Sequence, residues 1–276
     1  MTKPFNPAIT IEELNTSELS KSFLFIESMG DGGQGSVFKA LSTQDGKEVA
    51  VKIYSPDQLL KRAELEVSKL EKTNSPFLAK LIEYGSFEFR TQKCFYVVTQ
   101  FVKGMDLQKI MVNRTLTEEE ATRLLRQMLH AIEELWRLRV VHCDIKPANI
   151  MLSRTGDFQL IDLGIAKHLD AQTLTVAGYV MGTFGYMAPE QLKGRKNLTL
   201  RVDLFALGIV VYETLTLVHP FQKNQFLIGH IKPLPITEFV SVHDNLAKAI
   251  HWMLETNPIK RPSTCQQILH LIEGVV

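Results

Sequence analysis

The sequence has few cysteines and no excess of charge of either sign, and both absences narrow its function. Its three cysteines, Cys94, Cys143 and Cys265, include no CxxC pair. This argues against a disulfide framework and a structural zinc site, and it favours a reducing cytoplasm. Lysine and arginine total 31 against 30 aspartates and glutamates, so no net field directs the chain to nucleic acid or an anionic membrane. We therefore expect a cytoplasmic protein whose partner is a small molecule or another protein.

Long hydrophobic runs, internal repeats and low-complexity tracts are also missing. The first twenty residues lack the basic start and the apolar run of a signal peptide. The longest apolar stretch, residues 204–217, is shorter than the roughly 20 residues that cross a bilayer, and Asp203 and Glu213 bracket its core. We predict a buried helix there and no membrane segment. With 45% hydrophobic and 22% charged residues, the 276-residue chain can bury a sizeable core.

The pattern of the chain changes near residue 103, which predicts two lobes of the α+β class. From residue 23 to 102, the short runs FLFIESM, SVFKAL, EVAVKIY and CFYVVTQFV are typical of antiparallel strands. One helix interrupts them, beginning at Ser55-Pro56. Beyond Gly104 the spacing is helical, with a capping box at Thr117 and Glu120. We expect an N-terminal extension (1–20), a small β lobe with one helix (21–102), and a larger, mainly α-helical lobe (103–276), with a ligand in the cleft.

A glycine motif lies at the start of the predicted β lobe. Gly30, Gly32 and Gly35 form GxGxxG, and a strand-like run follows instead of the helix that a dinucleotide-binding turn needs. A glycine-rich hairpin tip suits a flap whose backbone N–H groups approach phosphates closely. A tight hairpin without a ligand explains the same residues.

A lysine follows this motif on a predicted strand. Alternation places Val49 and Val51 on one face, and Ala50 and Lys52 on the face that the glycine flap covers. A lone strand lysine is commonly a solvated surface charge. Glu66, however, lies on the apolar stripe of the following helix, where an unpaired carboxylate is costly. An ion pair with Lys52 satisfies both groups, and Glu64 is the competing partner.

The strongest local signal is the run from residue 140 to 152, which we interpret as a polar loop between two short strands. It holds Asp144, Lys146 and Asn149, which can accept a hydroxyl proton, neutralise phosphate charge and bind a metal. Asp162 follows a further apolar strand, where Mg²⁺ would find a carboxylate ligand. Each motif alone is also compatible with a capped turn.

Together and in this order, the motifs resemble eukaryotic-like serine/threonine protein kinases, closest in character to bacterial members, over residues 23–272. The Ala188-Pro189-Glu190 segment, the Asp203 and Gly208 pair, and Arg261 also match the family. The resemblance implies a two-lobed protein kinase fold. It also implies transfer of the γ-phosphoryl group of ATP, with Mg²⁺, to serine or threonine hydroxyls of proteins, including the chain itself.

The resemblance assigns a role to each matched residue. Lys52 would bind the α- and β-phosphates and pair with Glu66, while Asp144 would be the catalytic base and Lys146 would contact the γ-phosphate. Asn149 and Asp162 would bind Mg²⁺, with Mn²⁺ as an alternative. The other ATP contacts would be Gly30, Gly32, Gly35, Val37, Ala50, Thr99, Gln100, Val102 and Asp106. Glu190 would form a structural pair with a buried Arg261.

Substrate class follows from residues near the catalytic loop. Lys146, two positions after Asp144, and Gly182-Thr183 resemble serine/threonine kinases more than tyrosine kinases. Expected partners are therefore protein substrates, and a second copy of the chain during autophosphorylation. A nucleotide-binding scaffold without catalysis is disfavoured because all the catalytic residues are present. A small-molecule kinase is disfavoured by the Ala188-Pro189-Glu190 segment and Arg261.

Two positions depart from the family pattern. Cys143 stands where an arginine often receives an activation-loop phosphate, so a phosphate on Thr173 or Thr175 would lack that receiver. We expect the chain to be active without this phosphorylation. Cys143 is interpreted as a small packed residue, with a redox-sensitive thiol as the alternative. Leu163 replaces the phenylalanine after Asp162, which keeps that position apolar.

Overall fold

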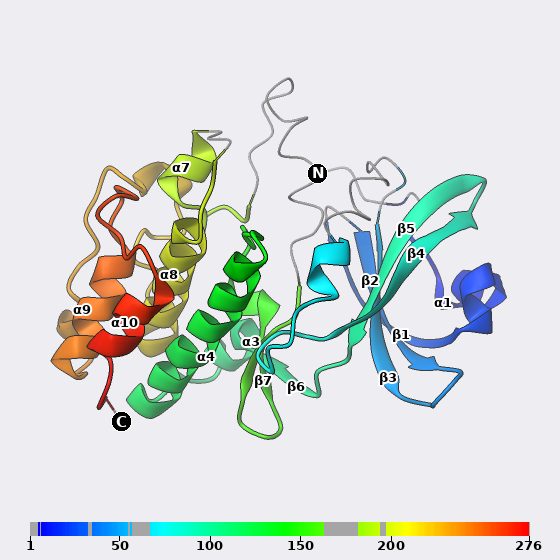
Figure 1. Cartoon of the computed structure of the whole chain (residues 1–276), viewed down its shortest axis with the longest axis horizontal. Helices are drawn as coiled ribbons and strands as arrows, with labels where there is room; N and C mark the ends of the chain where they lie inside the picture. The colour runs from blue at the N-terminus through cyan, green and yellow to red at the C-terminus, as the bar shows by residue number, and fades with distance from the viewer. Residues whose placement is uncertain are drawn as a thin grey trace. The chain divides into compact units, whose positions relative to one another are not determined.

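The computed structural model describes residues 5, 7–32, 35–54, 56, 67–162, 182–193 and 197–275 (Figure 1). Contacts divide the chain into two compact units. The first, called the β unit, comprises residues 1–72 and 79–101, and the second, called the helical unit, comprises residues 73–78 and 102–276. Within the described residues, none of the helices combines the length and the apolar character needed to cross a bilayer.

The β unit is built on one antiparallel sheet of five strands in the order β1-β2-β3-β5-β4. The strands are β1 (Phe23–Gly32), β2 (Gly35–Ser42), β3 (Glu48–Tyr54), β4 (Leu81–Phe89) and β5 (Gln92–Gln100). The four predicted strand runs are confirmed, although β5 ends two residues early. The sequence analysis missed β4. Its Glu83, Gly85, Ser86 and Glu88 obscure the apolar alternation, which an edge strand can tolerate.

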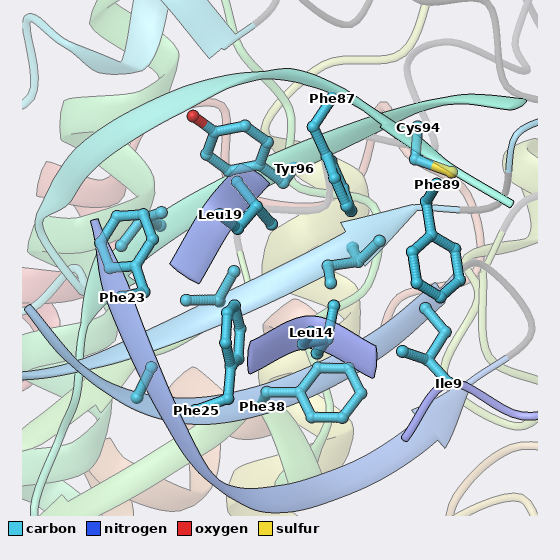
Figure 2. Packing of buried hydrophobic residues seen from close by; sticks show 14 of the residues in the cluster. Ile9, Leu14, Leu19, Phe23, Phe25, Phe38, Phe87, Phe89, Cys94 and Tyr96 are labelled. Atoms are coloured by element: carbon cyan, nitrogen blue, oxygen red, sulfur yellow. The ribbon is translucent and has the colours of Figure 1, made fainter. Parts of the chain in front are cut away.

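The alternation predicted for β3 is present in the structure. Val49 and Val51 are buried on one face of the sheet, while Ala50 and Lys52 are half-buried on the other. The buried face carries most of the hydrophobic core of the β unit, which includes many aromatic side chains (Figure 2).

The N-terminal segment completes this core. After Phe5 and Ile9, helix α1 (Ile11–Thr16) begins with a capping box between Thr10 and Glu13, and the turn η1 (Glu18–Lys21) leads into β1. Four of its apolar side chains are buried in the same cluster as the sheet residues: Phe5, Ile9, Leu14 and Leu19. Figure 2 shows Leu14 beside the aromatic rings of Phe25 and Phe38. The segment expected as an extension is therefore part of the folded β unit.

Arg90, in the turn between β4 and β5, fastens the N-terminal segment to the sheet. Its guanidinium donates to both carboxylate oxygens of Glu13, at 2.7 and 2.8 Å from Nη2. It also donates to the carbonyl oxygens of Pro7 and Ala8. Because α1 has only six residues, it depends on such tertiary contacts for its stability.

Replacing Leu14 by alanine should lower the free energy of unfolding by about 2–5 kcal/mol, because it leaves a cavity in a fully buried site. Chemical denaturation monitored by circular dichroism measures this change. Glu12→Ala, at an exposed position of the same helix, is the matched control and should change stability by less than about 0.5 kcal/mol. A Leu14→Ala protein as stable as the control would show that α1 contributes little to the core.

The helical unit combines a small sheet with a set of packed helices. Strands β6 (Gly104–Asp106), β7 (Ile150–Ser153) and β8 (Phe158–Leu160) form the sheet. The helices are α3 (Leu107–Met111), α4 (Glu118–Arg137), α7 (Pro189–Leu192), α8 (Arg201–Thr216), α9 (Asp244–Met253) and α10 (Cys265–Leu271). Three short 3-10 turns are η2 (Pro147–Asn149), η3 (Gln225–Leu227) and η4 (Ile236–Glu238).

Helices α4 and α8 lie side by side (Figure 1) and confirm two sequence predictions. Helix α4 begins at the predicted capping box, in which Thr117 and Glu120 each accept the backbone N–H of the other. Helix α8 is buried on every side from residue 202 to 215, as its uniform apolar pattern predicts. A helix buried in this way is a rigid support for loops attached to it.

One predicted strand is wrong. Residues 140–146 form no strand, and only the run after the polar loop, β7, is one. Val140 donates its backbone N–H to the carbonyl oxygen of Leu135. The N–H groups of His142 and Cys143 bond to the side chain of Asp203 on α8. The helix predicted from Ser55 lies mostly outside the described residues. Residues 67–70, at its end, are helical.

Candidate active site

Asp144 is the centre of the polar loop in the helical unit. The amide Nδ2 of Asn149 donates to the backbone oxygen of Asp144 at 2.9 Å and to its Oδ2 at 3.2 Å. Lys146 places its Nζ 3.2 Å from the same Oδ2. Turn η2, which starts at Pro147, brings Asn149 back to this position. Three residues predicted together in sequence are therefore in contact, around a carboxylate that is buried.

Thr183 joins this group from a distant part of the chain. Its Oγ1 donates to Asp144 Oδ1 at 2.7 Å and accepts a hydrogen bond from Lys146 Nζ at 2.9 Å. The sequence analysis used Thr183 only as a marker of substrate class and did not count it as a site residue. The Gly182-Thr183 pair before the Ala188-Pro189-Glu190 segment was the signal in the sequence that could have identified Thr183 as a site residue.

Helix α8 holds the loop through the buried carboxylate of Asp203. The backbone N–H groups of His142 and Cys143 donate to its two oxygens, each at 2.8 Å. Burial raises the pKa of Asp203 to about 7, while the two hydrogen bonds favour the charged form and oppose this rise. Cys143 adopts φ 62°, a conformation that residues with a side chain rarely take. Asp203 therefore fixes the backbone immediately before Asp144.

Asn149 and Asp162, the predicted metal ligands, are held next to each other by the pairing of β7 and β8. The N–H of Ile161, adjacent to Asp162, donates to the carbonyl oxygen of Asn149 at 2.9 Å. The ring Nε2 of His142 contacts the backbone oxygen of Asp162. Since the amide nitrogen of Asn149 faces Asp144, its Oδ1 remains as a ligand atom. One amide and one carboxylate oxygen fit a hard cation that also binds phosphate oxygens.

In the part of the chain that the structure describes, no three or more histidine, cysteine, aspartate or glutamate side chains are grouped so that they could hold a metal ion. Mg²⁺ commonly takes one or two carboxylates and completes its coordination with substrate phosphates and water.

The candidate phosphate-binding residues of the β unit lie on β1, β2 and β3. Gly30 faces Val37 and Gly32 faces Gly35 across the β1–β2 hairpin, and Val37 faces Lys52 across β2 and β3. A Cβ at Gly35 would collide with the backbone oxygen of Ile53, so this position requires glycine. The hairpin thus follows the predicted pattern, with Lys52 on the strand after it.

The candidate adenine and ribose residues are spread over both units. Ala50 faces Thr99 across β3 and β5, and Gln100 donates its N–H to the carbonyl oxygen of Lys80 at 2.8 Å. Val102 and Asp106 belong to the helical unit. Asp106 caps α3 by accepting the N–H of Lys109 at 2.9 Å, so it already has a structural role.

Several predicted residues lie outside the described part of the chain. These are Glu66 and its competitor Glu64, Leu163, and the two threonines Thr173 and Thr175. Cys143 is buried, in agreement with its interpretation as a packed residue.

The predicted pair of Glu190 and Arg261 is confirmed. Two parallel hydrogen bonds join them, from Nη1 to Oε1 at 2.7 Å and from Nη2 to Oε2 at 2.8 Å. The guanidinium also donates to the backbone oxygens of Glu255, Thr256 and Arg201 and lies over the ring of Phe205. Burial lowers the pKa of Arg261, and its pairing with Glu190 offsets only part of this fall. The pair joins α7 to the segment before α10.

Comparison with known families defines the class of this protein. The model of the protein kinase domain matches residues 23–271, so the chain belongs to the protein kinase family and has its two-lobed α+β fold. Members of this family use ATP and a divalent metal ion. The match begins at the first residue of β1, so α1 and η1 lie outside it although they complete the core of the β unit.

Three bacterial relatives illustrate the similarity. The chain is 35% identical to the probable serine/threonine-protein kinase PknB of Bifidobacterium longum, over 70% of this chain and 30% of the relative. It is 32% identical to the serine/threonine-protein kinase PknA of Mycobacterium tuberculosis, over 83% of this chain and 56% of the relative. It is 30% identical to the serine/threonine-protein kinase pkn3 of Myxococcus xanthus, over 90% of this chain and 48% of the relative. The alignments thus cover between about a third and just over half of each relative.

Proposed function

We propose that this chain transfers the γ-phosphoryl group of ATP to serine or threonine hydroxyls of proteins, including a second copy of itself, with Mg²⁺ as the preferred metal and Mn²⁺ as an alternative. The observation that carries the proposal is the convergence of Lys146, Asn149 and Thr183 on the carboxylate of Asp144. The names of the bacterial relatives support the same activity.

In this proposal Asp144 receives the substrate hydroxyl. A carboxylate at this point accepts the hydroxyl proton and orients the oxygen for attack on phosphorus. Thr183 already places a hydroxyl donor 2.7 Å from Asp144 Oδ1, so the carboxylate can accept such a bond. Lys146 places a positive charge beside the same group, where it can offset charge on the transferred phosphoryl group.

The metal would be held by Asn149 and Asp162. Mg²⁺ bound there would neutralise charge on the β- and γ-phosphates. Asn149 keeps its amide nitrogen on Asp144, so one residue would link the metal ligand set to the catalytic carboxylate. The close pairing of β7 and β8 keeps the two ligand-bearing residues in register.

The β unit would bind the rest of the nucleotide. The backbone of Gly30, Gly32 and Gly35 would approach the phosphates, and Lys52 would bind the α- and β-phosphates. The adenine and ribose contacts would be Val37, Ala50, Thr99, Gln100, Val102 and Asp106. This assigns ATP binding mainly to the first lobe and phosphoryl transfer to the second.

The direct test incubates the purified protein with radiolabelled ATP, Mg²⁺ and a generic acceptor protein, followed by mapping of the modified residues. Label on serine or threonine of the acceptor is the expected result. Label that appears only on a small hydroxyl compound supplied in place of the acceptor protein would identify a small-molecule kinase. Nucleotide binding without transfer would identify a scaffold. Either of these outcomes would contradict the proposal.

The proposed pairing of Lys52 with Glu66 predicts energetic coupling. Lys52→Met and Glu66→Gln should each lower kcat/KM, because either change leaves the other charge without its partner. The double variant should be less impaired than the sum of the two effects, with a coupling of about 0.5–3 kcal/mol. Steady-state kinetics of the four proteins in the cycle measures it. Glu64→Gln, combined with Lys52→Met, is the control and should be additive. Coupling in that cycle, and not in the first, would identify Glu64 as the partner.

A further inference from the structure

Gln225, a buried residue of η3, bridges two backbone groups of the segment 182–188 that carries Thr183. Its Oε1 accepts the N–H of Gly185 at 2.8 Å, and its Nε2 donates to the carbonyl oxygen of Met187 at 3.0 Å. The residue is 4% exposed. A carboxamide offers an acceptor and a donor in one planar group, which an ionised carboxylate or a protonated amine does not. The residue type therefore matches the two groups it contacts.

The bridged backbone is directly connected to the candidate active site. Tyr186, between the two bridged residues, donates its N–H to the carbonyl oxygen of Thr183 at 3.0 Å. The hydroxyl of Tyr186 donates to Glu213, near the end of α8. Thr183 in turn bonds to both Asp144 and Lys146. A shift of residues 185–187 would therefore displace Thr183 relative to the catalytic carboxylate.

The chain adopts an unfavourable conformation just before Gln225. Gln222 and Lys223 both have φ 54°, in the left-handed region that residues with a side chain rarely occupy. His219 holds this turn, because its Nδ1 accepts the N–H groups of Phe221 and Lys223 at 3.1 and 2.9 Å. Asn224 then caps η3. Such backbone strain persists where surrounding contacts impose it, and it concentrates at functional sites.

We propose that Gln225 is a positioning residue for the phosphate-accepting protein: it fixes residues 185–187 and so holds Thr183 against Asp144 and Lys146. The proposal rests on the proposed kinase activity. The proposal predicts different effects on the two substrates, the acceptor protein and ATP, because the residues assigned to ATP lie outside the segment 182–188. Loss of the bridge should therefore impair use of the acceptor and leave use of ATP intact.

The first test replaces Gln225 by methionine, which keeps the length of the side chain and removes both hydrogen bonds. We expect the KM for a protein acceptor to rise about tenfold, with the KM for ATP unchanged. Gln127→Met is the matched control. Gln127 on α4 is also buried and also bridges, accepting the N–H of Phe158 at 2.7 Å and donating to Asp157 at 2.8 Å. It should lose similar thermal stability while keeping the KM for both substrates.

The second test, Gln225→Glu, adds a signature that a loss of stability alone does not produce. An ionised carboxylate still accepts the N–H of Gly185 but cannot donate to the carbonyl oxygen of Met187. A protonated carboxyl group can do both, and burial favours protonation. Relative to the unsubstituted protein, the acceptor KM of this variant should therefore approach the normal value as the pH falls from 8 to 6.

The outcomes separate this proposal from the function on which it rests. An unsubstituted protein that phosphorylates no acceptor would overturn the proposed function. Activity with an unchanged acceptor KM in the Gln225 variants would overturn only the positioning role. If the acceptor KM of Gln127→Met rises equally, the positioning role of Gln225 is overturned as well. If Gln225→Met does not fold, the pH dependence of Gln225→Glu decides, and a pH-independent KM counts against the proposal.

Discussion

Replacing Asp144 by asparagine should lower kcat by about 10²- to 10⁴-fold, the range in which a positioned acid or base contributes to a reaction. Asparagine has nearly the same shape and can still accept a hydrogen bond from Thr183, but it cannot take up the substrate proton. The KM for ATP should change little, because Asp144 is not among the proposed metal ligands. Phosphate transfer to an acceptor protein, measured under saturating ATP, gives the rate.

Two further variants make this prediction specific. Asp162→Asn should also cripple turnover, but it should weaken Mg²⁺-dependent nucleotide binding as well, which calorimetry with and without Mg²⁺ distinguishes. Asp157→Asn is the matched control, since Asp157 is an exposed carboxylate of the same unit that bonds to Gln127 and Thr155. It should retain the full rate. Near-normal transfer by Asp144→Asn protein would contradict the assignment of the catalytic base.

Arg261→Met should lower the free energy of unfolding by about 3–5 kcal/mol, the cost of leaving one partner of a buried ion pair alone. The two side chains are 0% and 7% exposed, so water cannot replace the missing guanidinium beside Glu190. Three backbone oxygens, of Glu255, Thr256 and Arg201, lose a donor in the same change. Urea denaturation gives the free energy, and its slope shows whether unfolding remains cooperative.

An exposed ion pair of similar geometry provides the comparison. Arg114 forms two hydrogen bonds to Glu120, at 2.6 and 2.8 Å, but its side chain is 47% exposed. Arg114→Met should therefore cost about 1 kcal/mol or less. If both substitutions cost the same, burial of the Arg261 pair is not what makes it important for stability.

The sequence predicts the contacts around Asp144 well because the residues involved are close together in the chain. Asp144, Lys146 and Asn149 fall within six residues, and a short turn is enough to bring them into contact. Helix α8 was also predictable, because the apolar residues between Asp203 and Glu213 leave no polar face, which is typical of a buried helix. The pairing of Glu190 with Arg261 came from the family resemblance and not from spacing.

What the sequence did not predict depends on contacts between distant segments. The run at Val140 has strand-like residues, yet Val140 bonds to Leu135, and the backbone N–H groups of His142 and Cys143 bond to Asp203. Strand β4 has a weak alternation and is identifiable only beside β5. The burial of Leu14 likewise requires the sheet to be in place. Local pattern carries no information about such partners, so tertiary packing overrides it.

The N-terminal segment has a consequence for how the chain folds during synthesis. Glu13 bonds to Arg90, 77 residues further along, so α1 leaves the ribosome well before the turn that fastens it exists. Before β4 and β5 have been synthesised, the sheet is incomplete. It then lacks part of the apolar face against which Phe5, Ile9, Leu14 and Leu19 pack. Contacts that close such long loops slow folding and prolong the exposure of apolar side chains. Until the turn at Arg90 has been synthesised, this segment is therefore an aggregation risk for the nascent chain, and early binding by a chaperone there would protect it.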